Sequence, residues 1–269
     1  MRAVALHTDV IVFVSDQWQT TSTAVRSGEE GFLIDSPVFP EELRALPDVL
    51  NQAGYPVSGL LATHGDWDHL LGRLAYPGAV LGAADSTVAR INAELGAAQR
   101  ELRDFDEEHY VADRGPLQLG SLQPLPTPGR VELGADRELQ MYPADGHTPD
   151  GAAYWLPWAK VLVCGDYISP VEIPMLSPGG SVPAYRQTLA RLAGLIAQAE
   201  WVIPGHGAPV SAQRAQEVLV EDDAYLERLV RDPATAELPA GRATATQRQI
   251  HAANVAAVTG SEPPRHGEV

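Results

Sequence analysis

A short stretch of the chain, residues 63–69 with the sequence THGDWDH, places two imidazoles and two carboxylates within one turn. Imidazole nitrogens and carboxylate oxygens are the ligands that divalent metal ions commonly take from proteins. The apolar run at residues 57–62 directly precedes this stretch and predicts a buried strand. The candidate ligands therefore lie just beyond the end of that strand; they are His64, Asp66, Asp68 and His69. We therefore interpret it as a metal site.

Four further segments end on, or contain, a residue of the same chemical type. Asp35 ends the segment FLID, His147 lies within GHTPDG, Asp166 ends VLVCGD, and His206 lies within PGHG. Each follows a predicted strand, and open α/β sheets place their ligand sites beyond the carboxyl ends of strands. These residues are therefore candidates for the same site.

In this order, the segments resemble the motifs of the metallo-β-lactamase superfamily, whose usual first motif is His-x-His-x-Asp-His. The resemblance covers roughly residues 4–210, and Asp66 stands where the family usually has a histidine. It implies an α/β protein with a four-layer αββα sandwich. We expect a single metallo-β-lactamase-like domain over residues 1–269, with C-terminal helices from about residue 212.

The resemblance also implies a role for each candidate residue. One metal would be bound by His64, Asp66 and His147, a second by Asp68, His69 and His206, and both by a bridging Asp166. Asp68 and Asp166 are the candidate catalytic residues, because Asp68 would orient a metal-bound hydroxide and Asp166 would help to pass a proton to the leaving group. Asp35 is expected to hydrogen-bond to the turn that carries the ligands.

Two adjacent cations lower the pKa of a shared water and polarise the oxygen of a scissile bond. We therefore expect a dinuclear hydrolase that cleaves a small ester, lactone, thioester or amide. The alternative is an iron enzyme, mononuclear or dinuclear, that performs oxygen chemistry as sulfur dioxygenases do. Zinc is the first expectation for the two divalent ions. Iron and manganese stay open, because the carboxylate of Asp66 makes its site harder and more anionic.

Three residues near the ligands are candidates for substrate contacts: Trp67, Tyr167 and Met175. Core packing is an equal alternative for Trp67 and Tyr167. Met175 lies in the loop that follows Asp166 and would form an apolar pocket wall. The acidic, proline-containing region at residues 104–128 is expected to be a surface excursion, either a substrate lid or a solvated loop.

The composition limits the classes of partner. With 19 Lys and Arg against 35 Asp and Glu, the formal charge is −16, which argues against nucleic acids and anionic membranes. Cys164 is the only cysteine, lies in an apolar run and is expected to be buried. The chain has no apolar run of membrane-spanning length and no signal-peptide cleavage site near its start. We expect a cytoplasmic protein acting on a small molecule; the oligomeric state is not indicated.

Hydrophobic periodicity indicates the main elements. The expected strands are residues 4–6, 10–14, 22–26, 32–34, 57–62, 79–81, 138–142, 151–156, 160–164 and 201–203. The first expected helix covers residues 40–53, with a break at Pro47, and short or segmented helices are expected within 70–74 and 84–103. A further helix is expected from Ser181, as its N-cap, to about residue 199. The last two expected helices lie near residues 212–230 and 243–257. The tail beyond Gly260 is expected to fray.

Overall fold

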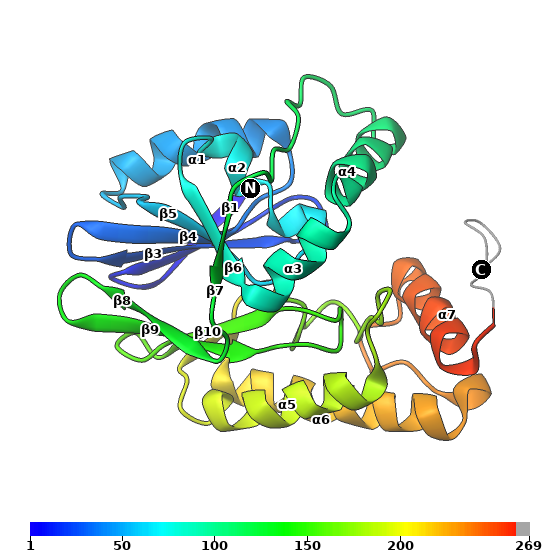
Figure 1. Ribbon diagram of the computed structural model, residues 1–269. Coiled ribbons are helices and arrows are strands. Elements are labelled where there is room, and N and C mark those ends of the chain that lie inside the picture. Colours follow the sequence, from blue (N-terminus) through cyan, green and yellow to red (C-terminus); the bar gives the residue numbers. More distant parts are fainter. Residues whose placement is uncertain (262–269) are drawn as a thin grey trace.

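The structure is a computed structural model, and it describes residues 1–261. The fraying expected beyond Gly260 concerns residues outside this range, apart from Ser261. Within the described part, two β-sheets face each other and helices cover both outer faces (Figure 1). This is the four-layer αββα arrangement that the resemblance implied.

The first sheet has seven strands within residues 1–261, arranged in chain order. They are β1 (Arg2–His7), β2 (Val10–Val14), β3 (Thr21–Ser27), β4 (Glu30–Asp35), β5 (Gly59–Ala62), β6 (Val80–Ala84) and β7 (Leu122–Leu125). The strands β1 to β4 form an antiparallel meander, whereas β4 to β7 are parallel. Because β4 and β5 are parallel, their carboxyl ends lie at the same edge of the sheet.

The second sheet has six strands among the described residues, in the order β13-β12-β11-β10-β9-β8. They are β8 (Gly129–Leu133), β9 (Arg137–Pro143), β10 (Ala152–Leu156), β11 (Val161–Val163), β12 (Trp201–Ile203) and β13 (Val210–Ser211). Only the pair β11 and β12 is parallel. Its crossover is α5 (Val182–Ile196), so β11 and β12 also end at one edge.

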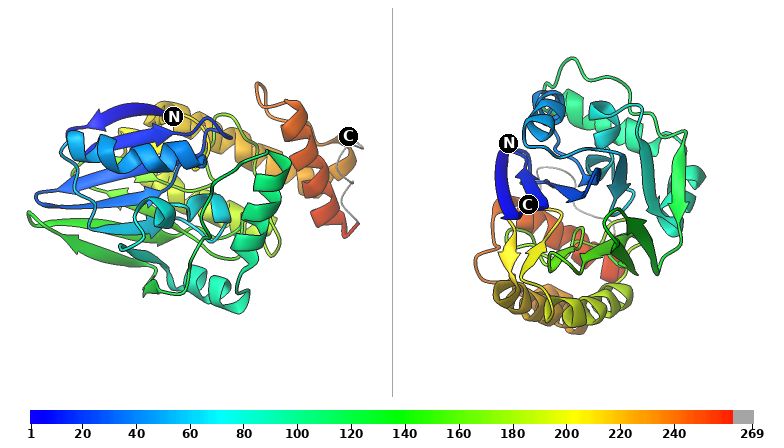
Figure 2. Two further views of the ribbon diagram at one scale, coloured as in Figure 1. Left: turned by 90° about the horizontal axis from the view of Figure 1, so that it is seen from above. Right: turned by 90° about the vertical axis from the view of Figure 1, so that its left-hand side faces the viewer.

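The helices form the two outer layers. On the first sheet lie α1 (Pro40–Gln52), α2 (Gly72–Ala75), α3 (Asp85–Ala93) and α4 (Ala97–Glu108), and on the second lie α5 and α6 (Ala212–Arg231). The helix α7 (Ala245–Thr259) lies at the same end of the sandwich as α4 (Figures 1 and 2). Short 3-10 turns are η1 (Trp67–His69) and η2 (Pro233–Thr235).

Three apolar clusters fill the spaces between the layers. One packs α1 to α4 on the first sheet, around Leu33 and Leu46. The second lies between the sheets and includes Ile34 and Tyr154, and the third packs α5 and α6 on the second sheet. Because both faces of the inner strands are covered, strands such as β5 and β10 are buried at every position.

Several sequence predictions of elements were wrong. The helix α1 runs through Pro47 without ending, because buried Leu43, Leu46 and Leu50 anchor its apolar face and outweigh the one lost hydrogen bond. Residues 104–108 belong to α4, where Leu102 and Phe105 are buried, rather than to an irregular loop. By contrast, Ser181 is the N-cap of α5 as predicted, since its side chain accepts a hydrogen bond from the backbone of Ala184.

Candidate metal centre

The seven candidate ligands lie in loops that follow strands of both sheets. The loop after β5 carries His64, Asp66, Asp68 and His69, and the loops after β9, β11 and β12 carry His147, Asp166 and His206. The structure brings all seven together. Among the described residues, three overlapping groups have ligand atoms within 4.8 Å of one another: His64 with Asp66 and His147; His64 with His69 and Asp166; and Asp68 with His69 and His206.

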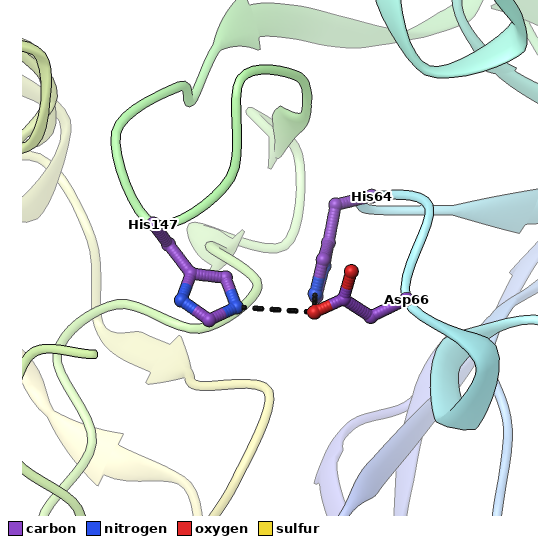
Figure 3. Close-up of side chains that lie close together, drawn as sticks. All are labelled: His64, Asp66 and His147. Atoms are coloured by element: carbon purple, nitrogen blue, oxygen red, sulfur yellow. Dashed lines mark ion pairs between the residues drawn. The ribbon is translucent and has the colours of Figure 1, made fainter. Parts of the chain in front are cut away.

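The first triplet consists of His64, Asp66 and His147. Oδ2 of Asp66 lies 3.6 Å from Nε2 of His64 and 3.4 Å from Nε2 of His147. Figure 3 shows the two imidazoles approaching this carboxylate from separate loops. Two imidazoles and one carboxylate are thus directed at one point.

The second triplet consists of Asp68, His69 and His206. Oδ2 of Asp68 lies 3.6 Å from Nε2 of His69 and 3.5 Å from Nε2 of His206. It repeats the chemistry of the first triplet, with two imidazoles and one carboxylate.

Asp166 lies between the two triplets. Its Oδ2 is 3.3 Å from Nε2 of His147, 3.4 Å from that of His206 and 3.8 Å from that of His64. Its Oδ1 is 3.2 Å from Nε2 of His69. The approach is possible because residue 205 is glycine: a Cβ there would overlap Oδ1 of Asp166.

An oxygen atom lies behind Nδ1 of each of the four imidazoles, and for His64, His147 and His206 the contact is a hydrogen bond. Nδ1 of His147 lies 2.9 Å from the carbonyl oxygen of Met175, which can only accept, so this nitrogen carries the proton. Nδ1 of His69 lies 3.1 Å from Oδ2 of Asp35. In the neutral form of His147, Nε2, the nitrogen that faces the centre, is therefore left with a free lone pair.

The other two imidazoles are held through threonine hydroxyls. Thr63 donates to Oδ2 of Asp35 at 2.9 Å, so it accepts from Nδ1 of His64 at 3.1 Å. Thr20 donates to a backbone carbonyl, so it accepts from Nδ1 of His206 at 3.3 Å. In the neutral form, these contacts give His64, His147 and His206 the tautomer that presents Nε2 to the centre.

Several ligand atoms are buried without a hydrogen-bond partner among the described residues. They are Nε2 of His64, His69 and His147 and Oδ1 of Asp166. Buried polar atoms are nearly always satisfied in folded proteins, because desolvation without a partner is costly. A metal ion would satisfy all of them, so the donor set fits a metal centre.

The carboxylates and imidazoles perturb one another strongly in the metal-free protein. Burial raises the pKa of Asp66, but the nearby imidazoles of His147 and His64 outweigh it and hold the pKa well below its usual range. Burial lowers the pKa of His147, but Asp66 and Asp166 outweigh burial and raise it to about 9. For His206, Glu172 and Asp166 likewise outweigh burial and raise the pKa to about 10. A cation can replace the protons on these rings.

The residues predicted to contact substrate have mainly packing or positioning contacts. Trp67 is 9% exposed and its ring lies 4.9 Å from that of Phe105. Tyr167 is buried, and its hydroxyl accepts from the backbone of His147 at 2.9 Å. Met175 is partly exposed and supplies the carbonyl that holds His147. Substrate contact by these three residues stays a prediction.

Two charged residues beside the first triplet, Arg90 and Asp150, were not predicted from the sequence as part of the site. Arg90 in α3 donates to Oδ1 of Asp66 and to Oδ1 of Asp150, both at 2.8 Å. The only sequence feature that points to such a residue is Asp66 itself, because a carboxylate in place of a neutral histidine favours a nearby positive charge. Nothing in the local sequence identified Arg90, which is 24 residues away from Asp66 along the chain.

The sequence model of the metallo-beta-lactamase superfamily matches residues 15–206. The chain belongs to this superfamily. Membership indicates a metal-dependent hydrolase, and the His and Asp groups described above are able to bind metal ions. No helix within residues 1–261 is both long and apolar enough to cross a membrane.

Solved structures share the fold at low sequence identity. A metallo-beta-lactamase family protein from Thermus thermophilus is 22% identical, with 84% of this chain and 83% of that chain covered and a TM-score of 0.64. A metallo-beta-lactamase from Pontibacter korlensis is 17% identical, with 81% and 97% covered and a TM-score of 0.59. The DIM-1 metallo-beta-lactamase is 18% identical, with 81% and 95% covered and a TM-score of 0.59.

Proposed function

We propose that this superfamily member uses two divalent ions to hydrolyse an ester, lactone, thioester or amide bond in a small molecule. The observation that carries the proposal is the shared orientation of four imidazoles. Each has Nε2 directed at the carboxylate of Asp166, which lies between two triplets of identical composition. Three of the rings, those of His64, His147 and His206, also have Nδ1 in a hydrogen bond on the opposite side. This arrangement supports one ion in each triplet with Asp166 between them.

When bound, such ions make a water acidic enough to attack at neutral pH and polarise the oxygen of the scissile bond. The chain supplies the orientation and the proton acceptors. The carboxylate of Asp68 faces His69 and His206, at 3.6 and 3.5 Å, and we assign it the role of orienting the attacking water. Asp166 faces all four imidazoles and is the second group able to accept and return a proton.

Zinc is the proposed metal, because triplets of two histidines and a carboxylate serve catalytic zinc sites. The same triplet is also the ligand set of non-haem iron oxygenases, and here it occurs at His64, Asp66 and His147. This observation favours iron oxygen chemistry as the second candidate function.

Metal analysis followed by a substrate panel separates the two functions. Protein purified without added metal would be analysed for bound zinc, iron and manganese. It would then be assayed with chromogenic ester, lactone, thioester, β-lactam and phosphodiester substrates. Two metals per chain with hydrolysis of a carbonyl substrate supports the hydrolase. One iron per chain, oxygen uptake with a thiol substrate and no hydrolysis would replace it with the oxygenase.

A further inference from the structure

Asp66 has different partners on its two carboxylate oxygens. Oδ2 faces His64 and His147, at 3.6 and 3.4 Å, and is the oxygen available to a metal in the first triplet. Oδ1 instead accepts a hydrogen bond of 2.8 Å from Nη2 of Arg90. An aspartate side chain rotates freely about its last bond unless a partner fixes it. Arg90 therefore fixes the rotation of this carboxylate so that one oxygen faces the centre.

The same guanidinium holds a second, fully buried carboxylate. Nη1 of Arg90 donates to Oδ1 of Asp150 at 2.8 Å, and the side chain of Asp150 is 1% exposed. Oδ2 of Asp150 accepts from the backbone nitrogen of Gly65 at 3.0 Å. Gly65 is the residue before Asp66, so these four groups close a ring around the turn that carries the ligands.

This ring connects the two loops that supply the first triplet. His64 and Asp66 flank Gly65 in one loop, and Asp150 follows His147 by three residues in the other. The second triplet has no contact with Arg90 among the hydrogen bonds of the described residues. Any effect of Arg90 on metal binding should therefore fall on the first triplet.

Charge gives Arg90 a second role at this position. Asp66 replaces the neutral histidine usual in the family and adds a negative charge beside Asp166. A guanidinium stays protonated at any pH at which the protein is folded, and its planar fork can bind two carboxylates at once. Lysine would keep the charge but has a single ammonium group without the fork, so it cannot reproduce this geometry.

We propose that Arg90 is the positioning residue of the first metal site: it ties Asp66 to Asp150 so that Oδ2 of Asp66 stays directed at His64 and His147. This inference rests on the proposed two-metal function. It predicts that replacing Arg90 weakens the ion of the first triplet and leaves the ion of the second unchanged.

The test compares Arg90→Gln and Arg90→Lys with the parent protein. The dissociation constant of each ion would be measured by zinc competition with a chromogenic chelator, and the fold by circular dichroism. We expect Arg90→Gln to raise the first-site constant by about 10- to 100-fold, the usual effect of losing a partner of a metal ligand. Arg90→Lys should recover only part of the lost affinity.

The control variant is Arg130→Gln, which also removes an arginine–carboxylate pair. Arg130 lies 3.1 Å from Glu138, but its side chain is 70% exposed and lies outside the centre.

Two double variants assign the effect to its site. In a His206→Ala background the second triplet lacks a ligand, so the tighter ion reports the first triplet, and Arg90→Gln should weaken it. In an Asp66→His background there is no carboxylate to orient, so Arg90→Gln should change little. If Arg90→Gln leaves both constants at parental values, the inference about Arg90 is overturned while the two-metal function stands. If the parent binds no zinc, the proposed function and this inference both fail.

Discussion

Asp166 faces more ligand groups than any other residue of the centre. Its two oxygens lie within 3.8 Å of the Nε2 atoms of His64, His69, His147 and His206. Burial raises its pKa, but the charges of His206, His69 and His64 outweigh burial and hold the pKa well below its usual range. A change at Asp166 would therefore disturb both triplets, whereas a change at Asp68 disturbs one. This difference makes Asp68 the better residue for a test of mechanism.

We expect Asp68→Ala to reduce kcat by about a hundredfold or more at saturating metal, because in the proposed function this carboxylate both binds the metal and orients the attacking water. The fold should persist, since Asp68 lies on the short turn η1 and its backbone carbonyl, which the substitution retains, accepts from Ser36 at 3.1 Å. The matched control is Asp104→Ala, which removes an exposed carboxylate from α4. Activity of Asp68→Ala within about tenfold of the parent would remove Asp68 from the mechanism.

Asp66, which stands where the family usually has a histidine, should influence which metal is bound. Asp66→His exchanges a hard anionic oxygen for a neutral nitrogen, so we expect the bound metal to shift toward zinc after growth in mixed metals. The less anionic centre should also favour the ionised form of an attacking water, which moves the acidic limb of the pH–rate profile to lower pH. Metal analysis and rate against pH would be compared for parent and variant. An unchanged zinc-to-iron ratio with an unmoved acidic limb would show that Asp66 does not bind the metal.

The seven ligand candidates were found in the sequence because their motifs are local and each follows an apolar strand. Their supporting residues were not, because these come from elements far away in the chain. Thr20, which holds His206, is 186 residues from it, and Asp150 contacts Gly65 over 85 residues. A serine, threonine or arginine gives no local pattern that distinguishes such a role from a surface position.

At the scale of elements, the loop between Asp166 and α5 is fastened by the C-terminal part of the chain. In α7, Asn254 accepts from the backbone of Leu176 at 2.9 Å and donates to the carbonyl of Pro174. These contacts fix the segment whose Met175 carbonyl holds His147. The C-terminal helices therefore help to shape the metal centre although they lie beyond residues 15–206, which match the family.

Arg242 fastens the same loop from the segment before α7. Its buried guanidinium donates to the carbonyl oxygens of Ser169 and Glu172, at 3.1 and 2.7 Å, and to Oδ1 of Asp222 at 2.6 Å. We expect Arg242→Gln to lower the free energy of unfolding by about 3–5 kcal/mol, because it leaves the buried Asp222 without its cation. Denaturant unfolding measures this. The double variant Arg242→Met with Asp222→Leu should be more stable than Arg242→Gln alone; equal or lower stability would contradict the assigned cause.

The sequence predicted the bounds of β2 and β12 to the residue, and those of β5, β10 and β11 to within two residues; all five lie in apolar runs. Strands β5, β10 and β11 are buried on both faces, and such strands have few polar residues to interrupt the pattern. Strands β7 and β8 were missed, because both contain exposed residues, lie in or next to proline-containing sequence and are at sheet edges. Edge strands carry the weakest hydrophobic signal. The face-to-face packing of the two sheets was predicted from the family resemblance and not from hydrophobic periodicity.

For the molecule as a whole, the centre makes stability depend on pH when no metal is bound. The pKa values of His147 and His206 are raised from 6.5 to about 9 and about 10 in the folded protein. Groups with a raised folded-state pKa contribute stability that is complete below the unfolded value and is lost as pH rises through the folded value. We therefore expect the Tm of the metal-free protein to fall between pH 7 and 10.

Metal binding should show the complementary effect. At pH 7 these two rings are protonated in the metal-free protein, so an incoming ion must displace their protons, and affinity should rise with pH up to about 10. Calorimetric titration of zinc in buffers of different ionisation enthalpy measures the protons released. The variant His147→Gln should release fewer protons when zinc binds. A Tm that rises from pH 7 to 10, or zinc binding without proton release, would contradict this description.

The central claim, that two ions bind to these seven side chains, is tested most directly by anomalous diffraction from crystals of the metal-loaded protein. We predict two anomalous peaks per chain. One should lie within about 2.0–2.2 Å of ligand atoms of His64, Asp66 and His147, and the other at the same distance from those of Asp68, His69 and His206. The carboxylate of Asp166 should lie between them. A single peak, or peaks bound by other residues, would contradict the account.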